Sequence, residues 1–301
     1  MMLIWLARKQ QESQLSFMTS ASLVGLYLLL IFIAGRWDIT GFWLRYIWII
    51  LLIGLLLFRL TKHRNYPLFD VAGIKAGISF SVKIAVILSM AFAIWQVRNN
   101  NTFKGEVVEL AHPLKLPFWY VIHGGSNGFM NPHRHVRAQE YAVDMTTLNL
   151  LGLRAIGLIP SDLTKYSAYG AEVTAPCNGR VIATENTLPD LNPLEMDSVN
   201  LAGNHVTISC KGVVVMLAHL MHGSITVDFD AEIEVGDIIG RIGNGGNSTE
   251  PHLHIHAIRE PPHGLSDLDE ILFSGEAVPI IFNREFLTRN SVGNYLKAFH
   301  R

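Results

Sequence analysis

Residues 243–256 read GNGGNSTEPHLHIH, a turn of Gly, Asn and Ser followed by His252, His254 and His256 at every second position. In an extended segment, side chains that repeat every two residues lie on one face of the strand. Neutral imidazole suits zinc, and a catalytic zinc site needs three protein ligands with a fourth position open to water. One strand supplies only part of this set, so we expect further His or Asp ligands elsewhere. The alternative is a polar strand face with solvated histidines.

The rest of the chain is uneven in composition. Of its 301 residues 50% are hydrophobic and 16% charged, and the net charge of -1 offers no global basic field for nucleic acid. Twelve of the 13 histidines follow residue 111, whereas Leu, Ile, Phe and Trp dominate the first hundred residues. The sequence therefore predicts a membrane part, residues 1–98, and a His-rich soluble part.

Three apolar segments, residues 15–34, 41–58 and 78–97, are each about long enough to cross roughly 30 Å of hydrocarbon as a helix. Arg45 and Lys83 lie near segment ends, where their stems can reach the headgroups, although a functional charge inside the membrane is the alternative for Lys83. Tryptophans near the predicted ends are typical of interfacial anchors: Trp37, Trp43, Trp48 and Trp95.

Basic residues predict the orientation of these spans. Arg8 and Lys9 precede the first span, and four more lie between the second and third: Arg59, Lys62, Arg64 and Lys75. The positive-inside rule then places the N-terminus and the second loop in the cytoplasm. We expect a multi-pass protein of the inner (cytoplasmic) membrane, anchored in the lipid bilayer, whose soluble domain is periplasmic or extracellular. An error in one span would reverse this side.

The soluble part follows a polar linker, residues 99–105, and comprises a domain at 106–282 and a tail at 283–301. We predict hairpins over residues 169–186, turning at Asn178-Gly179, and over 231–242, turning at Gly236-Asp237. Strands are also expected near 118–122, 204–210 and 213–220. The fold class is therefore three transmembrane helices followed by a mostly antiparallel β domain. Helices are considered only at 148–158 and after Asn283.

Metal-capable groups recur in the loop at residues 124–145, namely His133, His135 and Asp144. Asp144 lies in an apolar, strand-like context, where a carboxylate needs a charged or hydrogen-bonding partner. Zinc supplies such a partner, and a salt bridge to Arg134 or Arg137 is the alternative.

Cys177 and Cys210 are the only cysteines. An exported domain could oxidise them to a disulfide, and two buried free thiols are the alternative.

Several motifs in order resemble the lysostaphin or LytM-type zinc metallopeptidases, which cleave peptide bonds in bacterial peptidoglycan. The resemblance covers roughly residues 107–259. It rests on QEYAVD at 139–144, VTAPCNGRV at 173–181, GNHVTIS at 203–209, MLAHL at 216–220 and VGDIIGRIGNGGNSTEPHLHIH at 235–256. It implies a compact antiparallel sheet with a groove and one zinc ion per chain at the groove floor.

The resemblance also implies residue roles. Asp144 and His254 match zinc ligands, whereas His219 and His252 match catalytic histidines. The remaining ligand departs from the common His-x-x-x-Asp spacing, because Glu140 stands four residues before Asp144. Some relatives show Asn-x-His and a short insertion instead, and this pattern favours His133 over His135.

Other histidines of the soluble part have no assigned role in this scheme. His256 stands where many relatives have Glu, and it could be an outer partner of the metal site, a substrate contact or a polar face residue. His123, His205 and His222 are interpreted as structural.

The resemblance implies a membrane-anchored zinc metalloendopeptidase that acts on peptidoglycan peptides. A second hypothesis is a catalytically inactive LytM-like module that binds and activates a separate cell-wall hydrolase. A third, a transporter or sensor with a β appendage, is disfavoured because the only charges in the spans lie at their ends.

Overall fold

The computed structural model describes residues 1–9, 13–63, 66–68, 74–103, 105–260, 272 and 275–293. Contacts divide the chain into two compact units. The helical unit comprises residues 1–37 and 43–99, and the β unit comprises residues 38–42 and 100–301. The short segment Asp38–Phe42 is therefore part of the β unit, although it lies between two helices of the helical unit in the sequence.

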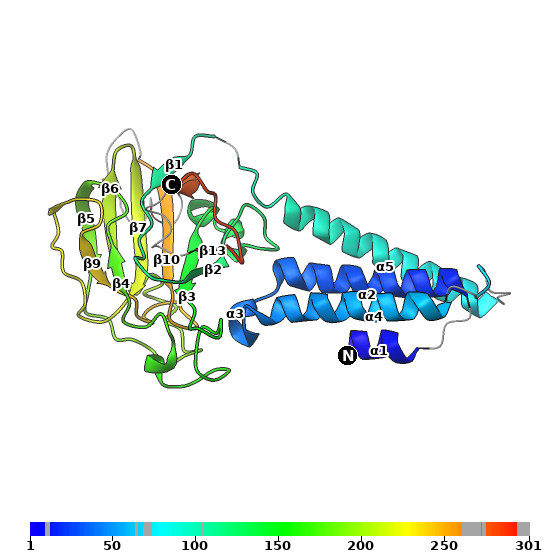
Figure 1. Ribbon diagram of the computed structural model, residues 1–301. Helices are drawn as coiled ribbons and strands as arrows, with labels where there is room; N and C mark the ends of the chain where they lie inside the picture. Colours follow the sequence, from blue (N-terminus) through cyan, green and yellow to red (C-terminus); the bar gives the residue numbers. More distant parts are fainter. Residues whose placement is uncertain are drawn as a thin grey trace. The chain divides into compact units, whose positions relative to one another are not determined.

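The helical unit contains α1 (Met2–Arg8), α2 (Gln14–Ala34), α4 (Leu44–His63) and α5 (Ile74–Arg98), and α2, α4 and α5 lie side by side (Figure 1). Three windows are long and apolar enough to cross a membrane: Gln14–Ala34, Leu44–Thr61 and Gly77–Arg98. Only 6% of the second window and none of the third is buried inside the protein, so both need an apolar surrounding. The three predicted apolar helices are confirmed, and the second begins at Leu44 rather than at residue 41.

Polar side chains in the helical unit have local partners. Ser13 caps α2, because its hydroxyl accepts a hydrogen bond from the backbone N–H of Ser16. Lys83 Nζ lies 3.3 Å from Ser20 Oγ of α2. The charge of Lys83 therefore has a polar partner within the helical unit.

The short helix α3 (Trp37–Thr40) starts at the last residue of the helical unit and continues into the β unit, whose described residues form three sheets. The main sheet has the order β13-β2-β3-β10-β7-β6-β5-β8, with β11 paired to β10, and every pairing in it is antiparallel. Figure 1 shows its central strands side by side. The strands of this sheet are β2 (Trp119–His123), β3 (Val143–Thr147), β5 (Gly179–Glu185), β6 (Asn204–Cys210), β7 (Val213–Leu220), β8 (Glu232–Ile233), β10 (Leu253–Arg259), β11 (Ala277–Val278) and β13 (Val292–Gly293).

Two small sheets complete the β unit. The strands β4 (Glu172–Thr174) and β9 (Ile238–Arg241) pair antiparallel, whereas β1 (Val108–Leu110) and β12 (Ile280–Phe282) pair parallel. The predicted fold class, three apolar helices followed by a mostly antiparallel β domain, is confirmed.

Two predicted hairpins are wrong. β4 and β5, expected to pair across Asn178-Gly179, lie in different sheets, and so do β8 and β9, expected to pair across Gly236-Asp237. Instead β4 pairs with β9, while β5 pairs with β6 and β8. Alternation and a turn signal identify a strand, but its partner depends on contacts distant in sequence. By contrast, the strands predicted at 204–210 and 213–220 are confirmed as β6 and β7, which pair antiparallel.

The segment 148–158, considered as a helix, is instead a loop. The side chain of Asn149 accepts hydrogen bonds from the backbone N–H groups of Leu151 and Leu153. Gly152 has a φ of 76°, a left-handed conformation that glycine adopts readily. The tail 283–293 holds β13 and no helix, and residues 294–301 lie outside the described part of the chain.

The main hydrophobic core fills one face of the sheet and includes Val121, Val143, Met145, Leu217 and Ile255. A smaller cluster, including Val214, Met216 and Ile258, lies apart from it. A disulfide joins Cys177, before β5, to Cys210 at the end of β6, with 6.1 Å between the Cα atoms. This is the oxidised form of the two alternatives that the sequence left open.

Candidate metal centre

The main sheet places His123, Asp144 and His254 in one row across three neighbouring strands. Asp144 on β3 is the cross-strand partner of His254 on β10 and of His123 on β2. Residues directly opposite in antiparallel strands have Cβ atoms about 5 Å apart. Accordingly, His254 Nδ1 lies 2.9 Å from Asp144 Oδ1, and His123 Nδ1 lies 2.8 Å from Asp144 Oδ2.

His123 reaches this row because the β2–β3 pairing shifts register between Val121 and His123. A β-bulge inserts one residue and turns the next side chain toward a new direction. Without the bulge, Ile122 would face Asp144. Sequence reasoning interpreted His123 as structural, and no pattern in the sequence marks the bulge. His123 is therefore a member of the site that sequence reasoning missed.

The expected alternation along β10 is confirmed. Leu253 and Ile255 lie in the main core, whereas His254 and His256 share the other face. His254 Nε2 lies 3.0 Å from His256 Nδ1, and His256 is 1% exposed. The ring of His254 is thus held at one nitrogen by Asp144 and at the other by His256.

His133 enters the site from a short 3-10 helix, η1 (Pro132–His135), and its Nε2 lies 2.8 Å from Asp144 Oδ2. Asn131 directs this helix: its side-chain oxygen accepts from the His133 N–H, and its amide donates to the carbonyls of Gly125 and Ala142. Asn131 is completely buried. The Asn-x-His pattern therefore fixes His133 next to the start of β3.

His219 and His252 flank His254, with 4.9 Å between the ring centroids of His219 and His252. His219 Nδ1 lies 2.9 Å from the carbonyl of Gly245, and His252 Nδ1 lies 2.7 Å from the carbonyl of Glu250. A carbonyl can only accept, so each Nδ1 carries the proton. In the neutral tautomers, each Nε2 then has a lone pair, and His252 Nε2 lies 3.7 Å from Asp144 Oδ1.

The Gly/Asn/Ser turn before β10 supports these two rings. Ser248 Oγ donates to Asn244 Oδ1 at 2.8 Å and lies 3.3 Å from His252 Nδ1. A Cβ on Gly203 would lie 2.4 Å from the carbonyl carbon of Gly245, so only glycine permits this close backbone approach. As expected from the sequence, these residues shape the turn that presents the histidines.

The electrostatics of the site centre on Asp144, which is 3% exposed. Burial alone would raise the pKa of Asp144, but electrostatic attraction to His133 and hydrogen bonds from His123 and His133 hold it well below its usual value. Burial lowers the pKa of His133, yet Asp144 reverses this effect and the net shift is upward. An anionic carboxylate therefore lies at the centre of the cluster.

Two other histidines are kept neutral. Burial, reinforced by His252, lowers the pKa of His219 well below its usual value. Burial also lowers the pKa of His254, although the hydrogen bond to Asp144 opposes this shift. Neutral rings are the form in which histidine binds a metal or accepts a proton.

The donor set fits a zinc ion. Ligating atoms of His123, His133 and Asp144 lie within 4.8 Å of one another, and His254 Nδ1 joins them on Asp144. The 2.8–2.9 Å contacts are those of hydrogen-bonded pairs, slightly below the ~3.3 Å between neighbouring ligands of tetrahedral zinc. Histidine nitrogens around one carboxylate are a zinc-type donor set.

The remaining candidates lie elsewhere. His135 is exposed, and the Nδ1 atoms of His205 and His222 lie near the carbonyls of Gly203 and Leu188. Arg134 pairs with Glu140, so the salt bridge considered for Asp144 is not formed with that arginine. The structure thus brings together His133, Asp144, His219, His252 and His254, and adds His123.

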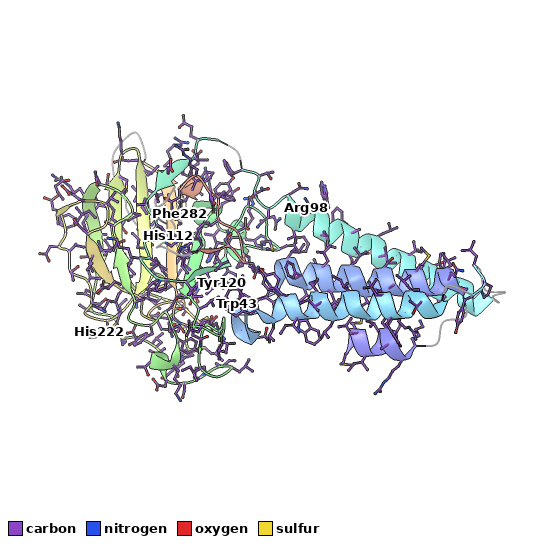
Figure 2. All side chains as sticks on the ribbon, in the orientation of Figure 1. Trp43, Arg98, His112, Tyr120, His222 and Phe282 are labelled. Atoms are coloured by element: carbon purple, nitrogen blue, oxygen red, sulfur yellow. A yellow bond between two sulfur atoms is a disulfide. The ribbon has the colours of Figure 1, made fainter. Side chains whose placement is uncertain are left out.

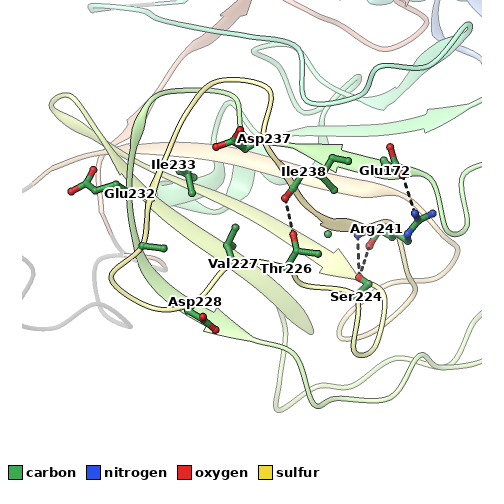
Figure 3. Close-up of a pocket in the computed structure, with 12 residues that line it drawn as sticks. Glu172, Ser224, Thr226, Val227, Asp228, Glu232, Ile233, Asp237, Ile238 and Arg241 are labelled. Carbon is green, nitrogen blue, oxygen red and sulfur yellow. Dashed lines mark hydrogen bonds and ion pairs between the residues drawn. The ribbon is translucent and has the colours of Figure 1, made fainter.

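An open pocket of about 650 Å³ lies elsewhere in the β unit, against β8 and β9 (Figure 3). It is lined by acidic side chains such as Glu172, Asp228 and Asp237, and Arg241 in it pairs with Glu172 at 2.9 Å. None of the clustered histidines lines this pocket.

Comparison with known families now identifies the domain. The model of peptidase family M23 matches residues 163–263, about a third of the chain. The chain contains an M23 peptidase domain. The match includes His219, His252 and His254 of the M23 domain, whereas His133 and Asp144 precede it. M23 is a family of metallopeptidases, which are hydrolases. No curated protein matches the chain.

Solved structures similar to the chain include a zinc-containing peptidase from Vibrio cholerae, with 20% identity and a TM-score of 0.30 over 48% of this chain and 35% of that one. The solution structure of lysostaphin has 18% identity and a TM-score of 0.26, over 44% of this chain and 42% of that one. The lysostaphin catalytic domain of Staphylococcus simulans has 19% identity and a TM-score of 0.23, over 35% of this chain and 77% of that one. The chain spans less than half of the first two proteins, and the identification rests on the M23 family model.

Proposed function

We propose that this chain is a membrane-anchored, zinc-dependent metalloendopeptidase that cleaves peptide bonds in peptidoglycan at the outer face of the cytoplasmic membrane. One observation carries the proposal: His133 and His254, which are far apart in the sequence, both contact the carboxylate of Asp144. His219 and His252 lie beside them with their Nδ1 protons engaged. The M23 family match supports the reaction class.

In this proposal His133, Asp144 and His254 hold one zinc ion. When bound, zinc acts as a Lewis acid on the scissile carbonyl and lowers the pKa of a water molecule toward ~7. Asp144 contributes the negative charge, while His256 on the far nitrogen of His254 fixes the orientation of that ring.

His252 is the proposed general base. The Glu250 carbonyl holds its Nδ1 proton, so the Nε2 lone pair is directed into the site and can accept the proton of the attacking water. His219 has the same tautomer and starts neutral. A proton taken from solvent water, favoured by the oxyanion that develops beside the ring, would let Nε2 donate a hydrogen bond to that oxyanion.

The membrane anchor supports the proposed location. Three helices have the length and composition of spans, and the basic residues beside them favour an external β unit. The disulfide between Cys177 and Cys210 is typical of an oxidising compartment. An enzyme held at the membrane reaches only the nearest peptidoglycan, which restricts the extent of cleavage.

The proposal is tested with the full chain in detergent. The purified protein is assayed for bound zinc and incubated with peptidoglycan, with and without chelator, and the released fragments are identified by mass spectrometry. We expect about one zinc per chain and chelator-sensitive cleavage of peptide bonds. Zinc near zero together with no cleavage would contradict the enzyme proposal and favour the inactive, hydrolase-activating module.

Two variants separate metal binding from catalysis. His254→Ala removes a proposed ligand and is expected to lose both zinc and cleavage. His219→Ala leaves the three ligands intact, so zinc should remain while the rate falls by about 10²–10³-fold. His205→Ala, outside the cluster, is the matched control and should keep both. Full activity in His219→Ala would contradict the proposed role.

A further inference from the structure

One loop of the β unit exposes an unusual amount of apolar surface. Residues 150–159 read LLGLRAIGLI. Five large aliphatic side chains in it are more than half exposed: Leu150 at 88%, Leu151 at 70%, Ile156 at 71%, Leu158 at 67% and Ile159 at 53%. Soluble proteins rarely expose such a concentration of apolar residues unless it contacts a partner or a membrane.

The loop is held in this form by its own polar contacts. Asn149 closes the turn that carries Leu150 and Leu151, and Arg154 Nη2 donates to the carbonyl of Leu158 at 3.0 Å. Arg154 is buried, with its Nε 2.5 Å from Glu250 Oε2. The only charge in residues 150–159 therefore points inward, and the exposed part of the loop is apolar.

The position of the loop follows from chain connectivity. Phe42 N–H donates to the carbonyl of Gly152, and Arg154 N–H donates to the carbonyl of Asp38, both at 2.9 Å. Asp38 is four residues after Ala34, the end of α2, and Phe42 is two residues before Leu44, the start of α4. Because one residue spans at most ~3.6 Å, Gly152 and Arg154 are bonded to chain that lies at most about 15 Å along the backbone from the end of a span.

We propose that residues 150–159 insert into the outer leaflet of the bilayer at the boundary between headgroups and acyl chains. This inference rests on the proposed membrane location of α2, α4 and α5. An apolar loop tied to the ends of membrane spans meets lipid first, and large aliphatic side chains gain from leaving water at that boundary. Lipid insertion would fix how the β unit approaches the surface.

A second exposed apolar loop provides the contrast. Leu194, Met196 and Val199 are also exposed, but acidic Glu195 and Asp197 lie between them. Carboxylates are repelled by anionic headgroups and are costly to bury in hydrocarbon. Val199 is 84% exposed and serves as the matched control.

The test uses the full chain reconstituted in phosphatidylcholine vesicles, with single cysteines introduced and labelled with an environment-sensitive fluorophore under non-reducing conditions. The variants are Leu151→Cys and Leu158→Cys in the loop, Val199→Cys as the control, and Leu88→Cys in α5 as the reporter of insertion. Lipids that carry a quencher on the acyl chain near the headgroup are then included, and a parallel sample with the quencher near the chain end reports on Leu88 at the middle of its span. We expect quenching at Leu151 and Leu158 about twofold or more above that at Val199.

Each other outcome counts against the inference. Quenching at Leu88 with none at Leu151 and Leu158 leaves the spans inserted and overturns the loop proposal alone. A blue-shifted but unquenched label would show that protein, rather than lipid, covers the loop. Equal quenching at Val199 would show that residues 150–159 enter lipid no more than the acidic loop does, and would overturn the proposal. No quenching at Leu88 would refute the membrane location and the loop insertion with it.

Discussion

At the scale of single residues, Asp144 is the centre of the candidate metal site. Its two carboxylate oxygens lie within 2.9 Å of nitrogens from His123, His133 and His254, and burial strengthens each contact. The family resemblance implied two of these three histidines. His123 joins them only because a bulge in β2 turns its side chain toward Asp144.

His123→Ala tests the part that the sequence did not reveal. In our proposal His123 holds Asp144 rather than the metal, and loss of such an outer partner typically weakens metal affinity about 10–100-fold. We expect weaker zinc binding in a chelator competition assay, with cleavage recovered at saturating zinc. His222→Ala, an exposed histidine bonded to a backbone carbonyl, should leave affinity unchanged. Unaltered affinity in His123→Ala would contradict the role.

His112 makes stability depend on pH. It stacks on Trp119 with 4.5 Å between ring centroids and lies beside Phe282 (Figure 2). Burial lowers the pKa of His112 to about 4, although a hydrogen bond with Leu114 opposes the shift. The unfolded chain, with a pKa near ~6.5, takes up this proton at a higher pH than the folded chain does. The contribution of neutral His112 is therefore complete above pH ~6.5 and is lost as the pH falls toward ~4.

The expected loss is about 3 kcal/mol of unfolding free energy between pH ~6.5 and ~4. His112→Phe keeps an aromatic ring on Trp119 but cannot bind the proton. In the presence of chelator, pulse proteolysis in urea at several pH values should show a shallower decline in stability for the variant than for the parent chain. Parallel pH profiles would contradict the assignment to His112.

At the scale of elements, the sheet register brings the site together. Leu253 and Ile255 fix which face of β10 points into the core, so His254 and His256 must occupy the other. Asn131 fixes the position of η1, because its three side-chain hydrogen bonds tie the helix to the neighbouring backbone. The alternation was readable in the sequence, whereas the partners of β4, β5, β8 and β9 were not.

The disulfide between Cys177 and Cys210 stabilises the β5–β6 region by closing a segment with a sequence separation of 33. The chain-entropy model gives on the order of 3–4 kcal/mol for a loop of this length. We expect a Cys177→Ser, Cys210→Ser double variant to lose this amount of unfolding free energy, measured by urea unfolding. Reductant should destabilise only the parent chain. Equal destabilisation of the variant by reductant would exclude the disulfide as the cause.

At the scale of the whole molecule, the β unit is not a continuous piece of the chain. Asp38 and Phe42 are at most 2% exposed, and Phe42 packs edge-to-face on Tyr120 with 6.0 Å between ring centroids. Asp38 Oδ2 lies 3.8 Å from Arg154 Nε, on the guanidinium that also contacts Glu250. The segment between α2 and α4 thus supports the stretch that carries His252.

Excision of residues 100–301 is therefore expected to weaken the β unit. Removing one buried aromatic side chain costs about 3–5 kcal/mol, and Arg154 also loses one of its two carboxylate partners. Pulse proteolysis should show earlier unfolding of the excised unit than of the same unit in the full chain. The stability of the β unit in full-length Phe42→Ala should lie between that of the excised unit and that of the parent chain. Equal stability of all three would show that Asp38–Phe42 is dispensable.

The sequence by itself determined the division into apolar helices and a β domain, because span length and strand alternation are local properties. The ordered motifs also implied His133, Asp144, His219, His252 and His254 as candidates. Only the tertiary structure decided which strands pair, that His123 faces Asp144, and that Asp38–Phe42 belongs with the β unit. These features depend on register, a bulge and contacts across long stretches of chain, and local sequence carries no signal for them.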